Sequence, residues 1–283
     1  MKEKKIYKSA PLPFQGQKRN FVADFKKVLT EFRSNHQITT IVDLFGGSGL
    51  LSHVAKKTYP DLRVIYNDFD DFHLRLTAVQ QTNKLLDKIR TYLLDVPKEE
   101  KIETSVRYMI LSLIRDAEKH KHYIDYITLS SSLMFSGRFV TSYEDLERQP
   151  FYNNIKKTDY QVDGYLDGLE VVKMDYMDLF KAFKSDKGVL FVIDPPYLST
   201  DTSTYNSNKY WKLKDYLDVL NVLSTGKYIY FTSNKSSIVD LCEWFATNYH
   251  LHNPFTGAQI NTSNVNINRT AKYTDMMLYK YQC

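Results

Sequence analysis

The sequence of 283 residues predicts an α/β fold built around a mostly parallel sheet. Short runs rich in β-branched and aromatic residues alternate with stretches of helical periodicity, which is the pattern of parallel strands joined by helices. The first four strands share one feature, since each ends in an acidic residue: Asp43, Asp68, Asp175 and Asp194. Ligands of such sheets bind outside the carboxyl ends of the strands, so we expect a site at that edge.

The N-terminal part of the chain supplies the first two strands and their helices. Residues 18–34 carry apolar side chains at helical spacing and are expected to form an amphipathic helix. One strand then leads into a glycine-rich turn and a helix, and a second strand leads into a longer helix. We expect these four elements at residues 38–43, 50–57, 62–70 and 71–90.

The middle of the chain differs from both ends. Residues 97–168 are charged and rich in tyrosine, with helical periodicity first and irregular sequence afterwards. The alternation of strands and helices resumes after this section, and no internal repeat or low-complexity linker interrupts the chain. We expect strands at residues 169–175, 189–193, 227–234 and 273–283, and helices at residues 211–226 and 236–249.

Composition restricts the class of protein. The formal charge of +5 permits a polyanionic partner without requiring one. The apolar runs are too short to span a bilayer, and the N-terminus has no apolar signal core. The two cysteines, Cys242 and Cys283, form neither a disulfide framework nor a metal-type spacing. We therefore expect a cytoplasmic monomer that uses no membrane and no metal.

The stretch "DLFGGSG" follows the first strand and opens a helix. Gly46, Gly47 and Gly49 allow a tight turn and a close approach of a ligand to the backbone. The free amides of the helix N-terminus point into the same space. A dinucleotide motif would have a third glycine where Ser52 stands, and the absence of a Walker lysine excludes a P-loop. The alternative that stays open is a strand-to-helix turn without a ligand.

Two of the acidic strand ends suit an adenosine-containing cofactor. Asp68 lies about twenty residues beyond the glycines, where a carboxylate can accept the hydroxyl hydrogens of a ribose. A surface aspartate in an Asn-Asp turn is the alternative for Asp68. Asp175 could accept a hydrogen bond from an exocyclic adenine amine, and capping of the next helix is an equal interpretation.

The tetrapeptide Asp194-Pro195-Pro196-Tyr197 is the most informative element. The two prolines make the backbone rigid and remove two backbone donors at the strand tip, so the tetrapeptide is either a strand terminator or part of a site. Asp194 and the Pro195 carbonyl could then accept both hydrogens of an exocyclic adenine amine and stabilise the charge that it gains as it reacts. Tyr197 could stack on the face of the base, which must leave a duplex to reach this site.

A third motif, "PFQGQK", precedes the first helix. Phe14 offers a flat apolar face, and Gly16 allows close approach of a ligand. Lys18 places a cation near the start of a helix, where the helix dipole does not favour one. This misplaced charge indicates an anionic partner such as a carboxylate, and a solvated lysine is the alternative.

In their order, "PFQGQK", "DLFGGSG", "YNDFD", "KMDYMD", "DPPY" and "FTSN" resemble the Dam-type (D12 class) DNA adenine-N6 methyltransferases. They lie between Pro13 and Asn234, so the resemblance covers most of the chain. "FQGQK" departs from the family, which usually has a tryptophan and paired glycines there. The resemblance implies an α/β fold with a seven-stranded AdoMet-dependent methyltransferase (Rossmann-like) sheet, one of whose strands, near the C-terminus, is antiparallel.

The resemblance also implies an activity and a division of labour. It implies methyl transfer from S-adenosyl-L-methionine (AdoMet) to N6 of adenine in double-stranded DNA, with base flipping. Residues 1–70 and 166–283 would form the catalytic domain, and residues 71–165 an inserted, mainly helical target-recognition domain. The implied catalytic residues are Asp194, Pro195, Pro196 and Tyr197. The implied cofactor-binding residues are Phe14, Lys18, Asp43, Phe45, Gly46, Gly49, Asp68, Asp175 and Asp194.

Basic residues interleaved with tyrosines in the insertion are expected to contact DNA phosphates and bases. These residues are Arg107, Arg115, Lys119, Lys121, Arg138 and Arg148. Two alternatives stay open, an RNA base methyltransferase and a catalytically silent DNA-binding protein of the same fold. A dinucleotide oxidoreductase is less consistent with the sequence, because no hydride-site residues are evident. A restriction–modification enzyme and a solitary or phage-borne one fit the resemblance equally.

Overall fold

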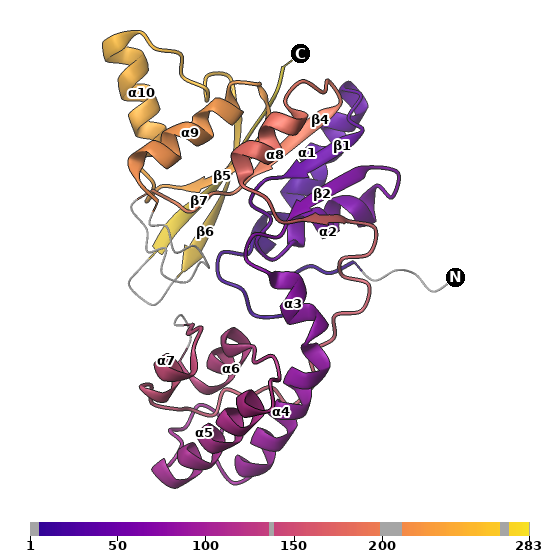
Figure 1. The fold of residues 1–283 in the computed structure, drawn as a ribbon. Helices are drawn as coiled ribbons and strands as arrows, with labels where there is room; N and C mark the ends of the chain where they lie inside the picture. The colour runs from indigo at the N-terminus through magenta and orange to yellow at the C-terminus, as the bar shows by residue number, and fades with distance from the viewer. Residues whose placement is uncertain (1–5, 136–138, 199–210, 267–271, 283) are drawn as a thin grey trace. The chain divides into compact units, whose positions relative to one another are not determined.

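A computed structural model describes residues 6–135, 139–198, 211–266 and 272–282 (Figure 1). The chain divides into two compact units. The sheet unit comprises Met1–Ser9, Gln17–Asp70 and Leu166–Cys283, and the helical unit comprises Ala10–Gly16 and Asp71–Tyr165. Ala10–Gly16, which the sequence places in the catalytic domain, thus groups with the helical unit.

The sheet unit contains a seven-stranded sheet in the order β3-β2-β1-β4-β5-β7-β6. Neighbours from β3 to β5 pair in parallel, whereas β7 is antiparallel to both β5 and β6. The predicted α/β fold with seven strands, one of them antiparallel, is confirmed. The strands are β1 (Thr40–Asp43), β2 (Arg63–Asn67), β3 (Glu170–Val172), β4 (Val189–Ile193), β5 (Lys227–Ser233), β6 (Gln259–Asn266) and β7 (Lys272–Tyr281).

Helices cover both faces of this sheet (Figure 1). On one face pack α1 (Val22–Asn35), which follows a 3-10 turn at Arg19–Phe21, and α2 (Leu50–Thr58). On the other face pack α8 (Tyr176–Phe183), α9 (Leu213–Leu223) and α10 (Ile238–Tyr249). The apolar stripe predicted in the first helix is buried as expected: Phe21, Phe25, Val28, Leu29 and Phe32. Burial of these apolar side chains holds the first helix on its face of the sheet. The helices pack on the faces, so the carboxyl ends of the strands are available for a site.

The helical unit is built from five described helices. The helix expected at residues 71–90 is interrupted at Ala78, which ends one helix and precedes the next. The buried side chains of the helical unit include Ile110, Ile114 and Leu129. The helices are α3 (Phe72–Thr77), α4 (Val79–Tyr92), α5 (Thr104–Lys119), α6 (Tyr126–Leu133) and α7 (Tyr143–Glu147). None of the helices in the described part of the chain is long and apolar enough to cross a membrane.

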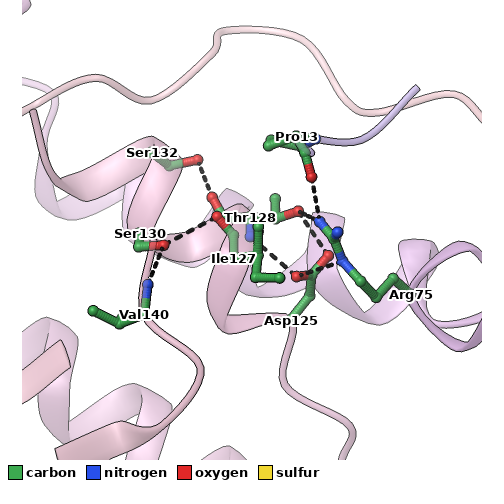
Figure 2. Close-up of polar contacts among 8 residues, drawn as sticks. All are labelled: Pro13, Arg75, Asp125, Ile127, Thr128, Ser130, Ser132 and Val140. Carbon is green, nitrogen blue, oxygen red and sulfur yellow. Dashed lines mark hydrogen bonds and ion pairs between the residues drawn. The ribbon is translucent and has the colours of Figure 1, made fainter. Parts of the chain in front are cut away.

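A buried ion pair organises the helical unit (Figure 2). The Arg75 Nε lies 3.0 Å from Asp125 Oδ1, and Arg75 Nη2 donates to the Pro13 carbonyl at 2.8 Å. Asp125 also accepts hydrogen bonds from the backbone N–H and the hydroxyl of Thr128, at 3.0 and 2.7 Å. Phe14 packs edge-on against Phe72, with 5.6 Å between ring centroids. These contacts explain why Ala10–Gly16 belongs to this unit.

Candidate active site

Acidic side chains follow three neighbouring strands at one edge of the sheet. Asp43 ends β1, and Asp68 and Asp194 come directly after β2 and β4. These strands pair in parallel, so their carboxyl ends share an edge. Asp175 differs, since it lies three residues beyond β3, is exposed, and caps α8 by accepting a hydrogen bond from the Met177 N–H at 2.9 Å. The capping interpretation of Asp175 is therefore confirmed.

The glycine turn packs directly against Tyr66 of β2. A Cβ at position 46 would lie 2.2 Å from the Tyr66 ring, so only glycine fits there. Gly49 has φ of +70°, which favours glycine. The Tyr66 hydroxyl donates to the Gly47 carbonyl at 2.7 Å and lies 3.0 Å from Asp68 Oδ1. Tyr66, which the sequence did not single out, thus ties the turn after β1 to the carboxylate after β2.

Asn67, the last residue of β2, also links neighbouring segments at this edge of the sheet. It is buried and donates through Nδ2 to the carbonyls of Leu44 and Met174, at 3.0 and 2.9 Å. Its Oδ1 accepts from the Met174 N–H at 2.9 Å. Asn67 therefore joins the segments that follow β1 and β3. The Asn-Asp pair in the sequence indicated a turn and gave no sign of this bridge.

Asp43 is a buried carboxyl group with a neutral partner. It is 3% exposed and accepts a hydrogen bond from the Ser52 hydroxyl at 2.7 Å. Burial above all, together with the nearby Asp194, raises the pKa of Asp43 to about 7, against the lowering effect of the hydrogen bond from Ser52. A buried carboxyl group with a perturbed pKa is typical of a functional site.

Asp194 pairs with the cation of the "PFQGQK" motif. Lys18 Nζ lies 2.6 Å from Asp194 Oδ2, so the anionic partner expected for Lys18 is a residue of the same unit. Burial nevertheless raises the pKa of Asp194, against the lowering effect of Lys18. Asp194 Oδ1 is shielded from solvent and has no hydrogen-bond partner among the described residues. One carboxylate oxygen is therefore neutralised and the other can still accept a donor.

Tyr197 completes the arrangement around Lys18. Lys18 Nζ lies 5.3 Å from the centroid of the Tyr197 ring and 5.8 Å from that of Phe231. The Tyr216 hydroxyl lies 3.5 Å from the Tyr197 carbonyl. These contacts place the Tyr197 ring beside the Lys18–Asp194 pair.

The sequence matches a model of the D12 class N6 adenine-specific DNA methyltransferases over residues 14–224, which is more than half of the chain. The chain belongs to this family. A Haemophilus influenzae protein named "Putative methyltransferase" is 36% identical over 288 residues, covering 99% of this chain and 95% of the relative.

A precorrin-6y C5,15-methyltransferase from Geobacter metallireducens GS-15 is a match among solved structures, with 10% identity and a TM-score of 0.31. It covers 95% of this chain and 94% of its own, and a likeness this weak carries no argument. The fold of this methyltransferase follows instead from the strand order of its own sheet.

The other residues implied for this methyltransferase lie in both units. Phe45 of the sheet unit packs against Tyr176, with 4.8 Å between ring centroids. Phe14 lies in the helical unit, as does the described part of the basic set. Among the described residues no cluster of histidine, cysteine, aspartate and glutamate could hold a metal ion.

The basic residues of the helical unit fall into two groups. Arg107 donates to the carbonyls of Gln149 and Glu147 and lies over the Phe151 ring, so its contacts are internal. The other described members are exposed, and Arg115 lies over the Tyr143 ring at 4.3 Å. The exposed members are Arg115, Lys119, Lys121 and Arg148. Arg138 lies outside the described residues.

Proposed function

We propose that this methyltransferase transfers a methyl group from AdoMet to N6 of adenine in double-stranded DNA, with the target base turned out of the duplex. The observation that carries the proposal is the Asp194 Oδ1, which is buried at the tip of β4 without a partner among the described residues. A buried acceptor without a donor costs free energy, so this oxygen favours a donor that the substrate supplies. An exocyclic amine is such a donor.

The sheet edge fits the adenosine part of AdoMet. Glycine at position 46 lets the turn lie directly against the Tyr66 ring at this edge, where a Cβ would not fit. Asp68, held beside the turn by Tyr66, would accept the ribose hydroxyls. AdoMet supplies an electrophilic methyl group on a sulfonium. The other proposed contacts are those of Phe14, Lys18, Asp43, Phe45, Gly49, Asp175 and Asp194.

Asp194 would act on the amine through one oxygen while Lys18 holds the other. The N6 nitrogen is a poor nucleophile because its lone pair is delocalised into the ring. Hydrogen bonds from N6 to Asp194 Oδ1 and the Pro195 carbonyl would draw the nitrogen toward tetrahedral geometry. The lone pair would form the N–CH₃ bond as the S–CH₃ bond breaks with its electron pair left on sulfur, and Asp194 would stabilise the positive charge on nitrogen.

One proton must leave N6 after transfer. The raised pKa of Asp194 makes this carboxylate a better proton acceptor than an ordinary one. Tyr197 would stack on the base, and its neighbour Pro196 keeps the backbone rigid. These roles follow the order of the tetrapeptide, with the acceptors first and the stacking ring last.

The helical unit would bind the DNA. Its exposed cations Arg115, Lys119, Lys121 and Arg148 are suited to phosphate contacts, which give affinity and position the enzyme. This assignment predicts that binding weakens steeply as the salt concentration rises.

The test is transfer of radiolabelled methyl from AdoMet to unmethylated DNA, with matched RNA as a competitor. We expect label in DNA alone, released as N6-methyladenine on hydrolysis. Label in RNA would favour an RNA base methyltransferase. Bound AdoMet without label in DNA of any sequence would overturn the proposed function.

A further inference from the structure

The segments that follow three neighbouring strands carry most of the proposed cofactor contacts. Phe45 and Gly46 follow β1, Asp68 follows β2, and Asp175 follows β3. In the sheet order, β2 lies between β3 and β1. A side chain at the carboxyl end of β2 can therefore reach both of the other segments.

Asn67, the last residue of β2, bonds to both of these segments through its side chain. Its Nδ2 donates to the Leu44 carbonyl at 3.0 Å and to the Met174 carbonyl at 2.9 Å, and its Oδ1 accepts from the Met174 N–H at 2.9 Å. Leu44 directly follows β1, and Met174 lies two residues beyond β3. The amide of Asn67 thus continues the hydrogen bonding between the three segments past the ends of the strands.

Backbone hydrogen bonds reinforce this junction. The Asn67 carbonyl accepts from the Gly46 N–H at 3.2 Å, and the Asp68 N–H donates to the Val172 carbonyl at 2.8 Å. The proposed cofactor residues are next in sequence to the residues of the junction, since Phe45 follows Leu44, Asp68 follows Asn67, and Asp175 follows Met174. The side chain of Asn67 therefore fixes the backbone beside each of them.

The burial of Asn67 makes these bonds hard to replace. Its side chain belongs to a residue that is only 1% exposed, so water does not substitute for a lost donor. A residue that only ended β2 would need no side-chain bond to either neighbouring segment. The pattern of bonds instead suits a residue that holds a ligand-binding edge at a fixed spacing.

We propose that Asn67 is a positioning residue of the cofactor site, and that it sets the spacing of the three segments that receive AdoMet. The proposal rests on the proposed function, because it takes AdoMet to bind at this edge of the sheet. Its effect falls on cofactor binding rather than on the transfer step, because Asp194 follows β4, which β1 separates from β2.

Asn67→Asp is the variant that tests this role, because it keeps the size of the side chain and removes both Nδ2 donors. The new carboxylate faces the carbonyls of Leu44 and Met174, which repel it. We expect AdoMet to bind about 10- to 100-fold more weakly, measured by calorimetry, because two buried hydrogen bonds are lost. At saturating AdoMet, kcat on DNA should fall less than about threefold, because the residues around Asp194 are unchanged.

Asn83→Asp is the matched control, in the helical unit. The half-buried Asn83 donates to the Tyr160 carbonyl and accepts from the Tyr160 N–H, both at 3.0 Å, so the same chemical change breaks a similar bond. AdoMet affinity should stay within about twofold of the wild type. Chemical denaturation without AdoMet measures the stability that each variant loses. A merely structural Asn67 would lower stability and leave AdoMet affinity unchanged.

The role of Asn67 would be overturned by a folded Asn67→Asp protein that binds AdoMet as the wild type does, or by an equal loss of affinity in Asn83→Asp. If Asn67→Asp does not fold, Asn67→Ser removes the amide without adding a charge and carries the same expected loss. Failure of both variants to fold would assign Asn67 a structural role and overturn the proposal as well. A wild-type protein that binds no AdoMet would instead contradict the proposed function, so the two failures are distinguishable.

Discussion

Asp125 and Asp194 each pair with one cation, yet their remaining hydrogen-bonding capacity is used differently. In the helical unit, Asp125 receives Arg75 and two donors of Thr128, all within 3.0 Å. In the sheet unit, Asp194 receives Lys18 at 2.6 Å on Oδ2, and its buried Oδ1 has no partner among the described residues. The first carboxylate is saturated by its own unit, whereas the second keeps an acceptor for a ligand.

The difference distinguishes a structural ion pair from a candidate catalytic one. A buried charge is tolerated when its lone pairs are all hydrogen-bonded, and such a site specifies one packing of the chain. A buried oxygen without a donor is a cost that the fold bears and a substrate can relieve. Asp43 differs from Asp194 in this respect, since it accepts a hydrogen bond from Ser52 and its raised pKa comes mainly from burial.

The largest expected effect concerns the structural pair. Arg75→Ala leaves the buried Asp125 without its cation, so we expect the helical unit to lose about 3–5 kcal/mol of stability. Chemical denaturation followed by circular dichroism measures the loss. The control is Arg148→Ala, which removes an exposed pair with Asp145 and should cost less than about 1 kcal/mol. Equal losses in the two variants would contradict the distinction.

The next effect concerns the candidate catalytic carboxylate. Asp194→Ala should lower kcat by at least about 100-fold, because it removes the group that stabilises charge on the nitrogen. DNA affinity should stay near that of the wild type, which a fluorescence-anisotropy titration can show. An enzyme that keeps its kcat without Asp194 would sink the proposed mechanism.

Asp43 gives a prediction of pH dependence. Its pKa of about 7 in the fold exceeds the ordinary value of 3.8, so the folded state binds the proton more tightly than the unfolded state. This group's contribution to the free energy of unfolding therefore falls as pH rises from about 4 to 7. Asn cannot ionise but can still accept from Ser52. Asp43→Asn should therefore become more stable than the wild type as pH rises through that window. The difference in the free energy of unfolding should reach up to about 4 kcal/mol once the pH exceeds the window. Parallel stability curves for the two proteins would refute this.

The smallest effect is expected at Tyr66. Tyr66→Phe keeps the ring that packs on Gly46 but removes the hydroxyl that ties Gly47 to Asp68, so AdoMet affinity should fall about fivefold. Tyr228→Phe is a matched control, because this buried tyrosine of β5 donates to the Pro254 carbonyl at 2.9 Å. Calorimetry should show weaker AdoMet binding in the first variant and unchanged binding in the second.

The sequence predicted most of the sheet because alternation and β-branched runs are local signals. It did not indicate β6, "QINTSNVN", whose asparagines disfavour a strand and whose stability comes from pairing along β7. It indicated α8, which is only 8 residues long, through the capping interpretation of Asp175 alone. Pairing of β6 along β7 is a tertiary contact that local propensity does not encode.

The residues of the candidate site also differ in whether the sequence alone could identify them. Asp43, Asp68 and Asp194 could be found from the sequence because they end parallel strands. Tyr66 and Asn67 could not, because their contacts depend on the register between strands. Phe14, which the sequence placed with the cofactor, packs on Phe72 of the helical unit through a long-range contact that no local pattern reveals.

The most direct test of the central claim is mass spectrometry of nucleosides from DNA incubated with the enzyme and AdoMet, for the wild type and Asp194→Ala side by side. We predict N6-methyladenine with the wild type and only a trace with the variant. Equal amounts of N6-methyladenine from both proteins, or methyl groups on another base, would contradict the proposed role of Asp194.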